Sequence, residues 1–300
     1  MQAAPTHEEP ARTRTRTPTP MHLARTRGEL RLWREECRAR GERVGFVPTM
    51  GYLHEGHLSL VGIARGAADR IAMSIFVNPL QFGPGEDLER YPRDLERDLE
   101  LARTAGVDLV FAPDAADMYP DGEPWVAVVP ERGADRLCGA SRPGHFRGVL
   151  TVVAKLFGLV RPEVAVFGQK DYQQLTLIRR MVRDLELGVE VLAGPIVREA
   201  DGLALSSRNV YLAPEERRRA LALSRGLAAC HSLYVAGERD AAVLRRELAV
   251  VGGEGVELEY AEVVHPDTLE AVERAGPGTV CLIAARVGAT RLIDNLVLMD

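Results

Sequence analysis

Several features that mark common protein classes are missing from this chain of 300 residues. Its four cysteines, Cys37, Cys138, Cys230 and Cys281, are far apart and form no CxxC pair, which indicates neither a disulfide framework nor a zinc site. No apolar run is long enough to cross a bilayer, and a net charge of −5 does not favour a nucleic-acid surface. We therefore expect a cytoplasmic protein that binds small molecules, with neither a membrane nor a nucleic acid as partner.

The first twenty residues lack the apolar segment of a secretory signal, although they are rich in threonine, arginine and proline. A transit peptide is the alternative, but Glu8, Glu9 and repeated prolines disfavour the amphipathic helix that it needs. We expect residues 1–20 to form a disordered tail, with the folded chain starting near Met21.

Lysine is scarce, because only Lys155 and Lys170 among the 38 basic residues are lysine. A lysine in a chain that otherwise uses arginine indicates a need for the compact charge of an ammonium group instead of the planar guanidinium group of arginine. Lys155 lies in the apolar segment VLTVVAKLFGLV. The simpler interpretation is that it belongs to a helix and extends its ammonium group to solvent. Lys170 lies in FGQKDY, and for it we favour a function.

The segment VPTMGYLHEGHLSLV holds the strongest functional signal. A helix is predicted from Leu53 onward, which places His54 and His57 on one face of its first turns. Unpaired N–H groups and the dipole at a helix start attract phosphate oxygens, and Gly51 and Gly56 allow a ligand to approach the backbone. The pattern predicts a site for a nucleotide phosphate.

Two simpler interpretations of these histidines remain. Either one alone is more typical of a helix cap or a hydrogen-bonded surface group. A zinc site of the metalloprotease type needs histidines four residues apart with a glutamate between them, whereas this spacing is three. The pair with its intervening glycine favours phosphate binding over both.

Buried-strand and helical patterns alternate from about residue 23 to 195, which is typical of a parallel sheet with crossover helices. Polar and turn residues follow the strand ends, where open α/β sheets bind ligands. Neither GxGxxG nor GxxxxGK[ST] is present, so the sequence contains neither a dinucleotide-binding fingerprint nor a P-loop. The predicted strands cover residues 43–47, 70–77, 109–112 and 164–168.

The pattern changes after GPIVREADG, and we expect the domain boundary near residues 194–198. We predict an α/β fold with a nucleotide-binding domain at residues 21–195 and a smaller α+β domain at residues 196–300. The predicted elements of the second domain are helices at residues 214–234 and 240–250, and strands at residues 257–264, 279–286 and 290–298.

Amide side chains follow the predicted strand at residues 70–77. Asn78 and Gln81 can pair with a carboxylate, a hydroxyl or an amine, although asparagine is also common in structural turns. Residues 86–100 alternate charged residues with leucines, and we interpret them as a solvated helix beside a mobile flap at residues 83–86.

Three more polar segments are candidates for the site. SRPGHFR is expected to be a polar loop in which Arg142 and His145 either bind an anion or serve as ordinary loop residues. In FGQKDYQQL, Lys170 and Gln174 are one helical turn apart and can face one cleft. In VREADGLALSSRN, two serines beside Arg208 predict a phosphate clasp.

In this order, VPTMGYLHEGHLSLV, FVNPLQFG, RPGHFRGV, FGQKDYQQL and READGLALSSRN closely resemble the pantothenate synthetase (pantoate–β-alanine ligase) family over about residues 23–300. HxGH alone marks a broad nucleotidyltransferase superfamily, whereas NPxQF and GQKDYQQ are specific to this family. The resemblance implies a Rossmann-like parallel sheet, a homodimer, and Mg2+ bound through ATP. It also implies ATP-dependent condensation of (R)-pantoate with β-alanine through pantoyl adenylate, releasing AMP and pyrophosphate.

The resemblance also implies roles for individual residues. The catalytic residues would be His57, His54, Lys170 and Arg208, with His57 as a proton donor and no metal ligand in the protein. The ATP site would comprise Met50, Gly51, His54, Gly56, His57, Gly168, Gln169, Lys170, Asp171, Val197, Leu205, Ser206, Ser207 and Arg208. The site for pantoate and β-alanine would comprise Gln81, Gln174, Asn78, Pro48, Met50, Arg142, Val152 and Val153.

Two alternative functions are less consistent with these residues. Another HxGH-type nucleotidyltransferase would need further basic residues near its acceptor, where this chain offers amides. A regulatory nucleotide-binding protein is expected to have lost His57, Lys170 or Arg208, and all three are present. Leu205 stands where many family members have methionine, which affects only packing against the adenine.

Overall fold

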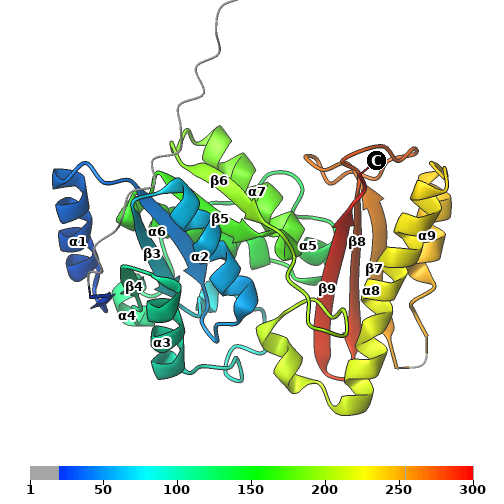
Figure 1. The fold of residues 1–300 in the computed structure, drawn as a ribbon, viewed down its shortest axis with the longest axis horizontal. Coiled ribbons are helices and arrows are strands. Elements are labelled where there is room, and N and C mark those ends of the chain that lie inside the picture. The colour runs from blue at the N-terminus through cyan, green and yellow to red at the C-terminus, as the bar shows by residue number, and fades with distance from the viewer. Residues whose placement is uncertain (1–19, 254, 300) are drawn as a thin grey trace, which may run out of the picture.

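The computed structural model describes residues 20–253 and 255–299 and contains two sheets (Figure 1). Residues 1–19, and with them nearly all of the predicted tail, lie outside the described residues. The strands are β1 (His22–Ala24), β2 (Val44–Thr49), β3 (Arg70–Ile75), β4 (Leu109–Phe111), β5 (Val164–Gly168), β6 (Glu190–Gly194), β7 (Glu257–Val264), β8 (Val280–Val287) and β9 (Thr290–Val297).

Nine α-helices and three 3-10 turns connect these strands within the described residues. The helices are α1 (Arg27–Ala39), α2 (Glu55–Ala67), α3 (Leu95–Ala105), α4 (Ala115–Met118), α5 (Cys138–Ser141), α6 (His145–Val160), α7 (Tyr172–Asp184), α8 (Pro214–Val235) and α9 (Ala241–Ala249). The 3-10 turns are η1 (Pro79–Gln81), η2 (Gln169–Asp171) and η3 (Ser207–Tyr211). Among the described helices, none is both long and apolar enough to span a membrane.

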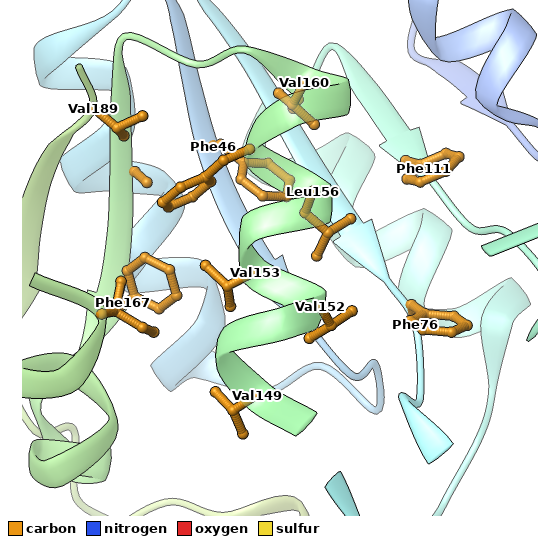
Figure 2. Packing of buried hydrophobic residues seen from close by; sticks show 14 of the residues in the cluster. Phe46, Phe76, Phe111, Val149, Val152, Val153, Leu156, Val160, Phe167 and Val189 are labelled. Carbon is orange, nitrogen blue, oxygen red and sulfur yellow. The ribbon is translucent and has the colours of Figure 1, made fainter. Parts of the chain in front are cut away.

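The first sheet has six parallel strands in the order β1-β4-β3-β2-β5-β6, with helices on both faces. Neighbouring residues of a strand point to opposite faces, so Phe46 packs in the core below α1, α6 and α7, whereas Val47 packs below α2 and α3. Figure 2 shows Val153 and Leu156 of α6 in the first of these cores, with Phe46 and Phe167 of the sheet. The predicted parallel α/β sheet is confirmed.

The second sheet is antiparallel, in the order β7-β8-β9. Helices α8 and α9 cover one face through a core that includes Leu227, Leu244 and Ile283. On the other face, Leu282 packs in one cluster with Leu137 and Tyr172, which lie at the starts of α5 and α7. Both helices lie between the two sheets (Figure 1). The predicted helices and strands of this region are confirmed to within one residue at each end.

Several local predictions were wrong. Strand β2 runs through Pro48 to Thr49, and proline fits because β2 pairs with β5 only at Gly45 and Phe46, so no bond to β5 requires the missing N–H. Strands β1 and β6 were not predicted. The polar loop predicted at SRPGHFR ends earlier than expected, because α5 includes Ser141 and α6 begins at His145.

The solvated helix predicted at residues 86–100 was also wrong. Helix α3 begins only at Leu95, after Asp94 caps it by accepting a hydrogen bond from the backbone N–H of Arg97 at 3.1 Å. Its Asp98 is buried, with 1% of its surface exposed. A charged residue at that depth requires partners, and these lie in the HxGH segment.

Candidate active site

A cavity of about 210 Å3 lies at the carboxyl ends of β2, β3 and β5. Parallel strands end at one edge of a sheet, so segments far apart in the sequence meet there. Most of the predicted site residues line this cavity, namely Pro48, Met50, His54, Gly56, His57, Asn78, Gln81, Val152, Val153, Gly168, Lys170, Asp171, Gln174, Val197, Leu205, Ser206, Ser207 and Arg208.

Three predicted residues do not line this cavity. Gly51 faces a separate hollow beside Tyr52, and its positive φ of 85° explains why glycine occupies this turn. Gln169 lines none of the three main cavities of the described residues. Arg142 lines a neighbouring cavity of about 410 Å3, which shares Lys170 and Arg208 with the first and reaches the second sheet.

The two histidines of HxGH lie together at the start of α2. His54 is the N-cap residue, so the helix begins two residues later than predicted. The backbone N–H of His54 donates to Nδ1 of His57 at 3.3 Å, and the two ring centroids are 4.0 Å apart. His57 therefore carries its proton on Nε2. A Cβ at Gly56 would lie 2.9 Å from Nδ1 of His54, so this close pair requires a glycine between the histidines.

Both imidazoles are neutral at physiological pH. Burial, followed by the charge of Lys170, lowers the pKa of His54 to about 4. Burial, followed by His54 and Lys170, lowers the pKa of His57 well below its usual value. These neutral rings can donate hydrogen bonds to phosphate oxygens, while the proton-donor role that the family resemblance implies for His57 stays a prediction.

Two charged side chains approach the cavity from opposite segments. Lys170 lies on η2, directly after β5, with its Nζ 3.8 Å from Oδ2 of Asp171. Arg208 lies on η3 and is paired with Asp87. Ser206 accepts a hydrogen bond from the backbone N–H of Arg208 at 3.3 Å, so the serine supports the loop that carries the arginine.

Two adjacent acidic residues, Glu86 and Asp87, bind two arginines of the site. Glu86 pairs with Arg142 at 2.6 Å, and Asp87 pairs with Arg208 at 2.8 Å. Desolvation raises the pKa of each carboxyl group, but the hydrogen bond and charge of its arginine outweigh it, so both pKa values are lowered. The sequence placed these acids on a solvated helix, and nothing local in it signals their pairing.

The amide cluster is internally bonded. Asn78 donates to Oε1 of Gln81 and to the carbonyl of Gly148, both at 3.1 Å, and accepts from Tyr119 at 2.8 Å. Its amide is thus occupied within the protein, which favours a role in orienting Gln81. The Nε2 atom of Gln81 lies 3.2 Å from Sδ of Met50 at the cavity wall. Gln81 is the amide of this cluster that a ligand can engage.

The hydrogen bonds of His145 bear on whether it binds an anion or is an ordinary loop residue, the two interpretations that the sequence left open. Its Nε2 accepts from Arg142 at 2.9 Å, and its Nδ1 donates to the carbonyl of Gln81 at 2.8 Å. Burial, followed by the charge of Arg142, lowers its pKa to about 4. His145 is a neutral link between the arginine and the Gln81 turn.

An apolar wall faces these amides. Val152 and Val153 of α6 line it, together with Pro48 and Met50. Helix α6 lies close to η1, because a Cβ at Gly148 would be 2.1 Å from the carbonyl oxygen of Leu80. The glycine therefore brings the valine face of α6 next to Gln81.

Sequence reasoning missed three buried polar residues near the site. The carboxylate of Asp98 accepts from the backbone N–H groups of Tyr52 and Leu53, both at 2.7 Å. Ser74 lines the cavity, and its Oγ has no hydrogen-bond partner among the described residues. Asn295 contacts the Lys170 turn. Only the burial pattern of a folded chain distinguishes these residues from ordinary polar ones.

The structure offers no obvious protein cage for a metal ion. Within residues 20–253 and 255–299, no group of three or more His, Cys, Asp or Glu side chains is placed to hold one. The imidazoles, Lys170 and Arg208 of this cavity are donors to anions, and Asp171 adds a single carboxylate beside Lys170.

A helix start with two neutral imidazoles, facing a lysine at the carboxyl end of a parallel strand, defines an α/β protein that binds nucleotide phosphates. The family model described as Pantoate-beta-alanine ligase matches residues 22–297, and the chain belongs to this family.

Individual relatives agree with this assignment. The chain is 59% identical over 278 residues to the pantothenate synthetase of Anaeromyxobacter dehalogenans, covering 88% of this chain and 94% of that protein. The crystal structure of pantothenate synthetase from Thermus thermophilus superposes with a TM-score of 0.88 at 49% identity, covering 93% of this chain and all of that one. The pantoate–β-alanine ligase of Francisella tularensis, complexed with β-γ ATP and β-alanine, has a TM-score of 0.76 at 32% identity, covering 93% and 98%.

Proposed function

We propose that the protein condenses (R)-pantoate with β-alanine to form pantothenate, using ATP. The observation that carries this proposal is the composition of one cavity, which combines the HxGH helix start and Lys170 with Gln81, Gln174 and an apolar valine wall. A small acid with a branched apolar body fits amides and valines, whereas a phosphate acceptor would need further cations. The relatives described above support this choice of substrates.

The first step is adenylation of pantoate. A carboxylate oxygen of pantoate attacks the α-phosphorus of ATP, and the bond from that phosphorus to the bridging oxygen of the β-phosphate breaks, releasing pyrophosphate. Lys170 and Arg208 neutralise charge on the phosphates, while His54 and His57 donate neutral hydrogen bonds to them. Gln81 and Gln174 hold pantoate, with its dimethyl group against Val152 and Val153.

The second step transfers the pantoyl group to β-alanine. The neutral amine attacks the acyl carbon of pantoyl adenylate, the bond from this carbon to the phosphate oxygen breaks, and AMP leaves while the amine loses a proton. In the neighbouring cavity, the carboxylate of β-alanine would bind Arg142 in competition with Glu86, which pairs with this arginine. Val197 and Leu205 line the same cavity, and we place the adenosine end of the nucleotide beside them.

The Mg2+ ion that the resemblance implies would be bound through ATP. Mg2+ prefers oxygen ligands, and Asp171 is the only carboxylate among the described residues that line this cavity, so the triphosphate would supply most of the ligands of the ion. When bound, the ion would neutralise phosphate charge.

Three broader properties complete the proposal. We place the domain boundary between residues 195 and 196, supported by the end of β6 at Gly194 and by the separate core below α8 and α9. Four buried free cysteines fit a reducing cytoplasm. The family resemblance supports a homodimer.

The decisive experiment is pyrophosphate–ATP isotope exchange with pantoate present and β-alanine absent. Pantoate-dependent exchange is expected, because adenylation is reversible before the amine arrives. A folded, ATP-binding preparation that shows no exchange but uses a phosphate acceptor would establish the alternative nucleotidyltransferase function.

Lys170 and His57 can be tested in the same assay. Lys170→Ala and His57→Ala should each lower exchange by about 10²-fold or more, as expected when charge stabilisation is lost. Lys170→Arg should also lower exchange, because the wider, planar guanidinium group replaces the compact ammonium group. Lys155→Arg is the matched control, since Lys155 lies outside both cavities against the ring of Tyr119. Normal exchange in Lys170→Arg would contradict the role of the compact charge.

A further inference from the structure

The turn that carries Lys170 is held by a residue of the second sheet. Asn295 lies on β9 and is buried, with 1% of its surface exposed. Its Nδ2 donates to the carbonyl oxygen of Gln169 at 3.0 Å and to that of Lys170 at 2.9 Å. Both carbonyls belong to η2, so one amide group spans the turn that places the lysine in the cavity.

This turn has little other side-chain support among the described residues. Gly168, which precedes η2, has no side chain that could cap the turn, and Asp171, which precedes α7, makes no side-chain capping bond. The Oδ1 atom of Asn295 is buried without a partner among the described residues, so the amide acts on the turn through its NH2 group alone. The two donor bonds assign the amide orientation.

The neighbouring residue on β9 is fixed to the other phosphate-facing segment. Asp294 accepts from Nη1 of Arg198 at 2.7 Å and from Nη2 at 3.0 Å, and its Oδ1 also accepts from the backbone N–H of Asn295 at 2.8 Å. Arg198 pairs through its backbone with Ala204, next to the loop that leads to Arg208. Strand β9 thus contacts both segments that carry cations to the cavity.

We propose that Asn295 is a positioning residue for the adenylation step, which holds the backbone of η2 so that Lys170 meets the phosphates. The inference rests on the proposed function, and it means that the second sheet helps to position a catalytic residue. Lysine has a flexible four-carbon side chain, so the position of its ammonium group depends on the backbone beneath it. Misplacing a catalytic group by about 1 Å can cost about 10²-fold in rate.

The test compares Asn295 variants in the pyrophosphate exchange assay. Asn295→Asp has the same shape but turns a carboxylate oxygen toward two carbonyls, and it should lower kcat about 10- to 100-fold with little change in the KM for pantoate. Asn295→Ser has a shorter side chain that loses both bonds but brings no negative charge toward the carbonyls, so its loss should be intermediate. Circular dichroism and thermal unfolding identify a variant that has not folded, and Asn295→Ser then serves as the milder variant.

A double-mutant cycle separates positioning from general damage. If Asn295 acts through Lys170, Asn295→Asp should lower exchange less than about twofold in a Lys170→Ala background, because the lysine that it orients is gone. Equal losses in both backgrounds, or full activity of folded Asn295→Asp, would overturn the inference. An inactive wild type would instead refute the proposed function, so the two failures are distinguishable.

Discussion

Asp87 holds the guanidinium group of Arg208 at two points, with Oδ2 2.8 Å from Nε and Oδ1 2.9 Å from Nη2. The carboxylate thus occupies one of the two bidentate edges of the guanidinium group, and each such edge can also bind a phosphate. The preceding residue, Glu86, binds Arg142 in the same way, with bonds of 2.8 and 2.6 Å. Two adjacent acids, Glu86 and Asp87, therefore neutralise two arginines at or beside the nucleotide cavity.

Asp87→Asn should strengthen ATP binding. Asp87 binds the Nε–Nη2 edge of Arg208 and neutralises its charge, so removing this carboxylate leaves the full positive charge of the guanidinium group for the phosphates. We expect the Kd for ATP, measured by calorimetry, to fall about fivefold, which corresponds to an ion pair of about 1 kcal/mol. Glu89→Gln removes the same charge from an exposed side chain of this segment and should leave the Kd unchanged. Weaker ATP binding in Asp87→Asn would show that Asp87 orients the arginine instead.

Asp98→Asn should destabilise the turn before HxGH. The two carboxylate oxygens of Asp98 accept backbone N–H groups from Tyr52 and Leu53, and Tyr52 has a strained φ of 52°. Asparagine would turn an NH2 group toward one of these donors, so we expect a loss of about 1–3 kcal/mol in the free energy of unfolding, measured with urea. ATP affinity should fall as well. Glu96→Gln, an exposed change on the same helix, is the control; a loss of the same size in both variants would contradict this role.

Gly56→Ala should separate stability from binding. Alanine favours a helix over glycine by about 1 kcal/mol, yet its Cβ would lie 2.9 Å from the ring of His54. We expect thermal stability to be retained while ATP affinity falls about tenfold or more, because the imidazole is displaced. Gly62→Ala lies on the same helix with open space around its Cβ, so it should raise stability and leave ATP affinity unchanged. Unchanged affinity in Gly56→Ala would show that the His54 ring position is unimportant.

Acid should weaken the fold between pH 6.5 and about 4. Burial, followed by a neighbouring cation, lowers the pKa of His54 and of His145 to about 4 from the usual 6.5. The unfolded chain then binds more protons than the native state in this window, so the free energy of unfolding falls as pH falls. Each histidine contributes a slope of up to about 1.4 kcal/mol per pH unit. Urea unfolding across this window should show a shallower slope for His145→Gln, and an equal slope would contradict the assignment.

Much of the site could be predicted because its signals are local. HxGH places two histidines and a glycine within one helical turn, so their proximity follows from the chain itself. The same holds for Lys170 and Gln174, which both line the cavity. Strand β5 was predicted at its observed bounds because a continuous apolar run is typical of a strand buried on both faces.

The misses share a different physical origin. Asp87, Asp98 and Asn295 are polar residues in segments whose patterns suit a solvated surface or an ordinary strand. Their partners are distant in the sequence: 121 residues separate Asp87 from Arg208, and 125 separate Asn295 from Lys170. No local pattern encodes such pairings, because they exist only when two segments pack together.

The sequence by itself determined the parallel α/β architecture and the residue types that can meet a phosphate, since both follow from short-range periodicity and from the chemistry of a helix start. Only the tertiary structure decided which of these groups are neutral, which arginines are paired, and which residues hold the reacting lysine. Burial sets the pKa values of His54 and His57, and burial is a property of the whole fold. Likewise, the second sheet reaches the Lys170 turn only because β9 packs against it.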